Sequence, residues 1–281
     1  MRRVLPRHQD FCSSGDYLEH GIIGLHGFMA EYVVEEWRLL HRVPRHLREV
    51  GVLVEPLTIA EKAMLAVRNT QLRLPWINRR RTALVIGADQ VGLLGAMKLV
   101  SAGYRTFVDS LGLPGSLPAR IAESIGATFV SADEIAVDAA AATLGSIDLV
   151  YEAVGAVQVS LEILYRLAPN GIYVFTGVPR HQSLEAIHPN QMIANLVLRN
   201  QAIVGVVNAG AEAFALAISD LSDFFSKWPD AVRSIITHRF RSSNSLRRLN
   251  LPPIPSRTLC RSKRQVLSNE QMQFGGIGAH C

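Results

Sequence analysis

The stretch Arg81–Asp109, RTALVIGADQVGLLGAMKLVSAGYRTFVD, decides the fold of this chain. Its run Ala83–Ile86 is short and continuously apolar, which is typical of a strand buried on both faces of a parallel sheet. The turn Gly87–Gly92 leads into an apolar helix that stops at Gly103, and a second strand follows and ends at Asp109. A strand, a glycine-marked turn, a helix, a second strand and an acid about 20 residues on predict a dinucleotide-binding βαβ unit.

Each residue type in this unit has a physical task. Gly87 permits the tight turn, Gly92 lets the helix approach the strand closely, and the helix N-terminus attracts the pyrophosphate. Asp109 can accept hydrogen bonds from the adenosine ribose, and it favours NAD because a carboxylate repels the 2′-phosphate of NADP. NADP stays open as the alternative, since the loop after Asp109 could bring Arg120 nearby. The predicted cofactor-binding positions here are Gly87, Ala88, Asp89, Val91, Gly92 and Asp109.

Asp89 departs from the pattern, because it stands where the middle glycine of G-x-G-x-x-G lets the backbone approach the pyrophosphate. It adds a Cβ and a like charge, and one such charge pair at about 4 Å costs roughly 4 kcal/mol at an effective dielectric of about 20. Rotation of the carboxylate into solvent would recover much of this. The alternative is a nucleotide-shaped fold that binds no cofactor tightly.

Composition sets the broad class of the protein. The chain has 281 residues, 48% of them hydrophobic and 19% charged, which describes a globular protein with one large domain and a partial second one. No apolar run approaches the ~20 residues of a membrane span, and the N-terminus has no apolar signal core. Three cysteines are too few for a disulfide framework. We expect a soluble, cytoplasmic protein that does not contact a membrane.

The basic charge is concentrated at the C-terminus. Residues 241–281 hold seven basic residues and one acidic residue, whereas the whole chain has a net charge of +5, so residues 1–240 carry −1. The segment is rich in Ser, Arg and Pro and has no sustained period, which predicts a disordered or foreign extension. An RNA-binding arm is the alternative, but it lacks interleaved aromatic residues, so we expect no nucleic-acid partner.

Further elements complete an α/β chain. The alternation in Phe28–Val34 predicts a half-buried antiparallel strand, and Glu55-Pro56 is expected to open a helix with proline at its first position. Buried strands are expected at 147–153, 172–176 and 202–207, and helices at 119–126, 159–167, 192–198 and 214–225.

Three sets of residues carry a family resemblance. The strings DYLEHGI (16–22), GFMAE (27–31) and EPL (55–57) resemble the zinc-dependent medium-chain dehydrogenases. LVLRNQAIVGVVNAG (196–210), WPDAV (228–232) and ITHRF (236–240) look like the glucose dehydrogenase branch of that family. The resemblance covers about residues 8 to 240. It implies a doubly wound parallel Rossmann sheet joined to a GroES-like catalytic domain.

The resemblance also implies an activity, namely NAD(P)-linked oxidation of an aldose such as glucose at its anomeric hydroxyl, with a catalytic zinc as Lewis acid. By the same resemblance Glu55 lies near the zinc, Glu19 binds sugar hydroxyls, Asn208 lies near the nicotinamide and sugar, and Thr176 is a strand-end cofactor contact. The plainer alternatives are that Glu19 and Glu55 are ordinary loop and helix-start acids, and that Asn208 caps the helix that follows it.

The chain also departs from this family. The zinc-binding Cys and the Gly-His-Glu motif lie upstream of where this chain begins, so we expect it to start partway through the catalytic domain. Glu55 is then the only metal-ligand candidate, because the spacing of His20, His26 and His41 matches no zinc pattern.

We therefore expect an incomplete GroES-like domain with its linking helix at 1–72, a Rossmann domain at 73–240 and the basic tail at 241–281. A homo-oligomer through the Rossmann domain is the expected assembly. The rival interpretation is a non-catalytic nucleotide-binding or subunit-interaction protein that has lost the zinc site.

Overall fold

The computed structural model describes residues 10–12, 15, 17–30, 32–73, 81–131, 144–179 and 188–239, together with the backbone of 279–280. No helix within these ranges combines the length and the apolar character needed to cross a bilayer.

The strands form two sheets of very different size. The small sheet contains β1 (Leu18–His20), β2 (Gly24–Leu25) and β9 (Ala279–His280). The large sheet contains β3 (Thr82–Ile86), β4 (Arg105–Ser110), β5 (Thr128–Ser131), β6 (Ile147–Glu152), β7 (Leu167–Phe175) and β8 (Ala202–Gly205).

The helices precede and alternate with the strands of the large sheet. Three 3₁₀ turns come first, at η1 (Trp37–Leu39), η2 (Arg45–Leu47) and η3 (Gly51–Leu53). The described α-helices are α1 (Val54–Gln71), α2 (Gln90–Ser101), α3 (Leu117–Ser124), α5 (Val157–Leu164), α6 (Pro189–Leu198), α7 (Ala211–Lys227) and α8 (Pro229–Ile235).

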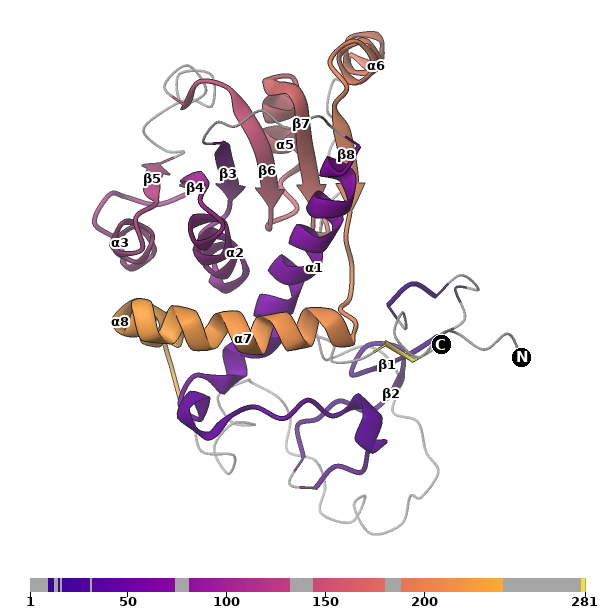
Figure 1. The fold of residues 1–281 in the computed structure, drawn as a ribbon, viewed down its shortest axis with the longest axis vertical. Helices are drawn as coiled ribbons and strands as arrows, with labels where there is room; N and C mark the ends of the chain where they lie inside the picture. Colours follow the sequence, from indigo (N-terminus) through magenta and orange to yellow (C-terminus); the bar gives the residue numbers. More distant parts are fainter. Residues whose placement is uncertain are drawn as a thin grey trace, which may run out of the picture.

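All six strands of the large sheet run parallel, in the order β5-β4-β3-β6-β7-β8. This is the order of a doubly wound dinucleotide-binding sheet, in which the chain starts at the centre and moves first to one edge and then to the other. The predicted α/β fold with a doubly wound parallel sheet is therefore confirmed, and Figure 1 shows α2 and α3 beneath the β3–β5 half of the sheet.

The buried side chains of β3 explain why helices cover both faces of the sheet. Successive residues of a strand point to opposite faces. Ala83 and Val85 pack with α1, α2 and α7 in one apolar cluster. Leu84 and Ile86 pack with α5 in a second cluster. A continuous apolar run is what a strand buried on both faces requires.

Several sequence expectations need correction. The described part of Phe28–Val34 contains no strand, and Tyr32 and Val34 are 89% and 98% exposed, whereas Phe28 packs against the His20 ring of β1 at 4.4 Å. Helix α1 begins at Val54, so Pro56 is its third residue and not its first. Strand β5 was not predicted at all. Cys12 is disulfide-bonded, which the cysteine count did not lead us to expect.

The basic tail lies almost wholly outside the described residues. The backbone of Ala279–His280 is the exception, and it pairs antiparallel with Leu18–Glu19 of β1. The predicted disorder of 241–281 therefore stays a prediction for the rest of that segment.

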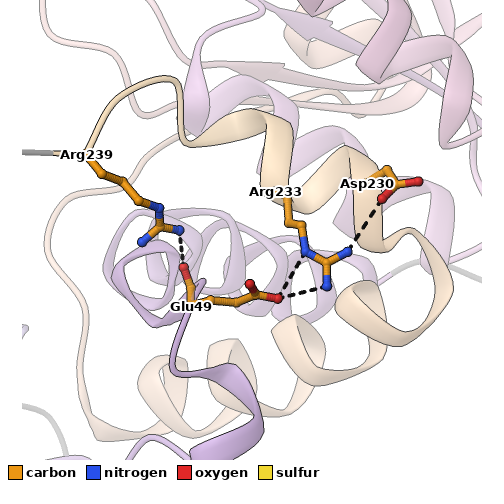
Figure 2. A network of polar contacts seen from close by, with 4 residues as sticks. All are labelled: Glu49, Asp230, Arg233 and Arg239. Atoms are coloured by element: carbon orange, nitrogen blue, oxygen red, sulfur yellow. Dashed lines mark hydrogen bonds and ion pairs between the residues drawn. The ribbon is translucent and has the colours of Figure 1, made fainter.

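Glu49 ties the end of the described Rossmann region to the segment before α1 (Figure 2). Its Oε1 accepts hydrogen bonds from Arg233 Nε at 3.0 Å and Nη2 at 2.8 Å, and its backbone carbonyl accepts one from Arg239. Arg233 Nη1 also approaches Asp230 Oδ1 at 3.5 Å. These side chains are about half exposed or more. The two hydrogen bonds to Glu49 Oε1 therefore orient the Arg233 side chain but contribute little to stability.

A buried charge cluster joins α1, α2 and α7, which lie side by side in Figure 1. Lys98 Nζ lies 2.7 Å from Glu61 Oε2 and also pairs with Asp220, and the Glu61 side chain is fully buried. Burial raises the pKa of Glu61 to about 7, because desolvation together with repulsion from Asp220 outweighs the attraction of Lys98.

This cluster predicts how stability depends on pH. A carboxyl whose pKa is higher in the folded state than in the unfolded state stabilises the fold at low pH, and this contribution is lost as the pH rises through about 7. We expect Glu61→Gln to be more stable than the parent protein at pH 8.5 by about 1–3 kcal/mol, and to differ little from it at pH 5.

Urea unfolding at pH 5, 7 and 8.5 measures this difference. Glu123→Gln, at an exposed position of α3, is the matched control and should leave the pH dependence unchanged. An unaltered pH profile in Glu61→Gln would contradict the prediction.

Candidate dinucleotide and sugar site

The carboxyl ends of the parallel strands are aligned by a row of backbone hydrogen bonds. Gly87 N donates to Asp109 O at 2.8 Å and Ala153 N donates to Ile86 O at 3.1 Å. Further along, Thr176 N donates to Glu152 O at 2.9 Å and Val206 N donates to Phe175 O at 2.9 Å. Ligands of open α/β sheets bind outside this edge, so the predicted positions Gly87, Asp109 and Thr176 lie together where a ligand is expected.

The turn between β3 and α2 requires its two glycines for different reasons. Gly87 has a φ of +105°, which side chains strongly disfavour, and a Cβ there would lie 2.2 Å from Val154 Cγ2. A Cβ on Gly92 would lie 2.1 Å from the Gly87 carbonyl oxygen. Ala88 is buried between them, and Val91 packs against the core. This backbone geometry is that of a pyrophosphate-binding turn.

Asp89 is the N-cap residue of α2, and its Oδ1 accepts a hydrogen bond from Gly92 N at 2.9 Å. Aspartate is a favourable N-cap because its side chain satisfies an amide that the helix leaves free. The carboxylate is therefore turned toward the helix terminus and not away from it. The turn fits a dinucleotide in its backbone, but it carries a resident negative charge where the pyrophosphate would lie.

Asp109 is the acid at the end of β4, and only 7% of its surface is exposed. Burial raises the pKa of its carboxyl from 3.8 to about 6. At neutral pH the carboxylate is ionised and can accept hydrogen bonds from ribose hydroxyls. Arg120, which could have favoured NADP, donates instead to Gly115 O at 2.6 Å.

Sequence reasoning missed Glu152, the last residue of β6, which is fully buried. Its Oε1 accepts hydrogen bonds from three successive backbone amides, Val154 N at 2.8 Å, Gly155 N at 2.6 Å and Ala156 N at 3.3 Å. Glu152 thus fixes the loop that places Val154 over Gly87. The sequence signal that could have identified Glu152 is its position as a single acid at the end of an apolar strand, three residues before Gly155.

The predicted sugar-site residues come from three separate elements. Glu19 lies on β1, Glu55 in the first turn of α1, and Asn208 in the loop after β8. Burial raises the pKa of both acids, that of Glu55 to about 7. Among the described residues no hydrogen bond or ion pair joins any two of the three, so their common site stays a prediction. Asn208 does not cap the following helix, since Gly210 is the N-cap residue of α7.

The described residues do not supply a zinc site. They contain no group of three or more His, Cys, Asp or Glu side chains placed to hold a metal ion. His20 places Nε2 2.7 Å from Glu35 Oε2 and Nδ1 2.8 Å from His26 O, so both of its ring nitrogens are engaged. His41 stacks on Phe214 at 4.6 Å, and burial lowers its pKa.

Fold and turn together define a protein with the doubly wound fold of the dinucleotide-dependent dehydrogenases. The family model for the glucose dehydrogenase C-terminus matches residues 48–249, and the chain belongs to this family. The match runs nine residues past Phe240, where we had expected the resemblance to end.

Two curated relatives support this assignment. Glucose 1-dehydrogenase 2 of Vulcanisaeta moutnovskia is 42% identical over 240 residues, and glucose 1-dehydrogenase of Methanocella arvoryzae is 35% identical over 235 residues. Each alignment covers 84% of this chain and 65% of the relative, so the chain spans about two thirds of their length.

A solved structure agrees with these matches. The structure of Haloferax mediterranei glucose dehydrogenase in complex with NADP, Zn and gluconolactone superposes with a TM-score of 0.72 at 27% identity. It covers 84% of this chain and 69% of that protein.

Asp89 gives a prediction for cofactor affinity. Asp89→Gly should strengthen NADH binding about ten- to thousandfold (about 1.4–4 kcal/mol), because it removes a like charge beside the pyrophosphate. It should lower stability by only a few tenths of a kcal/mol, since glycine is a tolerable N-cap.

Asp89→Asn separates charge from size, because asparagine keeps the Cβ and caps a helix as well as aspartate does. Fluorescence titration measures the NADH affinity of the parent protein, Asp89→Gly and Asp89→Asn. Equal affinity in Asp89→Gly and the parent protein would show that the carboxylate does not oppose the cofactor.

Proposed function

We propose that the carboxyl edge of the large sheet binds a nicotinamide dinucleotide, and that the chain serves NAD(P)-dependent oxidation of an aldose such as glucose at its anomeric hydroxyl. The observation that carries this proposal is the Gly87–Gly92 turn, in which the Gly87 amide donates to the backbone carbonyl of Asp109, the acid next to the end of the neighbouring strand β4. The family assignment supports it, as does the NADP and gluconolactone complex of the Haloferax relative.

In this proposal the aldose loses a hydride from its anomeric carbon and a proton from the attached hydroxyl, which leaves a lactone. The bound nicotinamide supplies the hydride acceptor. Glu19 is proposed to hold sugar hydroxyls, and Asn208 to contact the nicotinamide end of the site. The carboxyl of Glu55, with its pKa of about 7, could exchange a proton near neutral pH, which is the property of an acid–base group.

Titration with NADH, followed by its fluorescence, tests the proposed function most directly. Saturable binding supports it. A complete lack of NADH binding by the parent protein and by Asp89→Gly would exclude the cofactor role of this edge.

The terminal acid of β4 predicts cofactor choice. We expect NAD to bind more tightly than NADP, because the Asp109 carboxylate repels the 2′-phosphate, and the preference should be largest above pH 7, where both groups are ionised. It should shrink as the pH falls through about 6, where Asp109 takes up a proton.

Parallel titrations with NAD and NADP at pH 5.5 and 8 measure this preference. In Asp109→Asn the preference for NAD should be smaller at pH 8 than in the parent protein. Tighter binding of NADP by the parent protein would contradict the prediction.

The shortage of possible zinc ligands among the described residues predicts weak catalysis. A catalytic zinc needs about three protein ligands and an open position, and Glu55 alone matches a ligand position of the family. We expect this chain by itself to show little or no aldose oxidation even with zinc and glucose supplied. Metal analysis and a coupled NADH assay check this, and about one bound zinc per chain with zinc-dependent turnover would overturn it.

A second candidate function is a non-catalytic nucleotide-binding or subunit-interaction protein. The Asp89 carboxylate at the Gly92 amide favours it, because the capped helix terminus is stable without a ligand. Absence of NADH binding in the parent protein, with its appearance in Asp89→Gly, would support this reading.

We also propose a homo-oligomer formed through the large sheet. Its terminal strand β8 and the neighbouring helix α6 support this assembly, since Ile193, Val197 and Leu198 of α6 are 55%, 69% and 82% exposed. A cytoplasmic location is proposed from the composition, with no nucleic-acid or membrane partner.

A further inference from the structure

Lys62 is a buried cation on α1 that the proposed function does not use. Its Nζ lies 2.7 Å from Asp10 Oδ2 and donates to two backbone carbonyls, Val207 O at 2.7 Å and Asp10 O at 3.3 Å. The same nitrogen lies 4.2 Å from the centre of the Phe11 ring. Both partners of the ion pair are 8% exposed, so this ammonium joins three distant parts of the chain in a nearly dry environment.

The carbonyl that Lys62 holds belongs to the loop that follows β8. The next residue, Asn208, has a φ of +57°, a strained conformation for a residue other than glycine. Asp10 closes the other side of this loop, since a Cβ on Gly210 would lie 2.6 Å from Asp10 Oδ1. Lys62 and Asp10 therefore clamp the loop from both ends of Asn208.

The loop that Lys62 and Asp10 hold lies at the ligand edge of the large sheet. Val206 is the last member of the row of backbone hydrogen bonds along the ligand edge, and Asn208 lies two residues beyond it. The other two asparagines with positive φ in the described part of the chain, Asn170 and Asn200, lie toward the amino ends of β7 and β8. Of the three strained asparagines, Asn208 alone is at the edge where ligand is expected.

Burying a lysine is costly unless its charge is paired and its hydrogen bonds are made, and an apolar residue would fill the same space at lower cost. An ammonium that donates to a main-chain carbonyl fixes the backbone itself. Helix α1 is held in place by its packing against α2 and α7. Its residue Lys62 therefore fixes the position of Val207 in the loop after β8, which has no regular secondary structure.

We propose that Lys62 is a positioning residue for the nicotinamide half of the cofactor: it acts through Val207 O to hold Asn208 at the ligand edge. The proposal rests on the proposed dinucleotide binding. The adenosine half is bound at the other side of the sheet centre, at Gly87–Gly92 and Asp109, and Lys62 has no part in it. Lys62 therefore affects a complete dinucleotide and leaves its ADP-ribose portion untouched.

The test compares NADH with ADP-ribose, which lacks the nicotinamide. We expect Lys62→Met to weaken NADH binding about tenfold and to leave ADP-ribose binding within about twofold of the parent protein. Asn208→Gly, in which glycine accepts the positive φ, should give the same pattern. The double variant should lose no more NADH affinity than Asn208→Gly alone, since the two residues act in series.

The matched control is Arg73→Met. Arg73 Nη2 donates to the carbonyl oxygen of Asn200 at 2.8 Å, so it is also a charged side chain bound to the backbone at an asparagine with positive φ, but at the amino end of β8. This control should change neither affinity. Lys62→Met removes the ammonium that pairs with Asp10 and leaves the Asp10 carboxylate buried without this partner. Lys62→Met is therefore also made in a second background, Asp10→Asn, in which that negative charge is absent.

Each result is decisive. A selective loss of NADH binding that is not additive with Asn208→Gly supports the proposal. Loss of both ligands in both backgrounds would make Lys62 a general structural residue, and unchanged NADH binding would also overturn the proposal. If the parent protein binds neither ligand, the proposed function itself fails, which is distinguishable from failure of the clamp.

Discussion

The close approach of α2 to the large sheet is the constraint on which the site depends. A Cβ on Gly92 would meet the Gly87 carbonyl, and one on Gly95 would lie 2.3 Å from the Tyr151 ring. No larger residue fits either position without moving the helix. This contact sets the helix N-terminus at the carboxyl edge of β3, and with it the place where Asp89 and Asp109 meet a ligand.

The buried charged residues Lys62, Lys98 and Glu152 act in two ways. Lys98 joins the side chains of Glu61 and Asp220 and thereby connects helices. Lys62 and Glu152 bind backbone groups of loops at the ligand edge instead. The first kind sets how stability depends on pH, whereas the second shapes the surface that a ligand would contact.

The sheet was predictable from the sequence because apolar runs and glycines are local signals. The strand at Ala83–Ile86 and its turn were found almost to the residue. The strand predicted at Phe28–Val34 was wrong, because alternation alone does not bury side chains: Tyr32 and Val34 stay exposed and only Phe28 packs on a neighbouring ring. Lys62 could not be found, because its role depends on Val207, 145 residues away along the chain. Glu152 was missed although its partners Val154, Gly155 and Ala156 are local. Asp89 was recognised as a departure, but only coordinates show which way its carboxylate turns.

The row of hydrogen bonds along the ligand edge runs between peptide groups, so the side chains at those positions do not hold the strands in register. Mutational drift at the edge can therefore alter what the protein recognises without disturbing how it folds. Asp89 is an exception, since the same carboxylate caps the helix terminus and sets the charge that a ligand meets. At the four hydrogen-bonded positions, the register of the strands depends on peptide atoms, whereas recognition of a ligand would depend on the side chains.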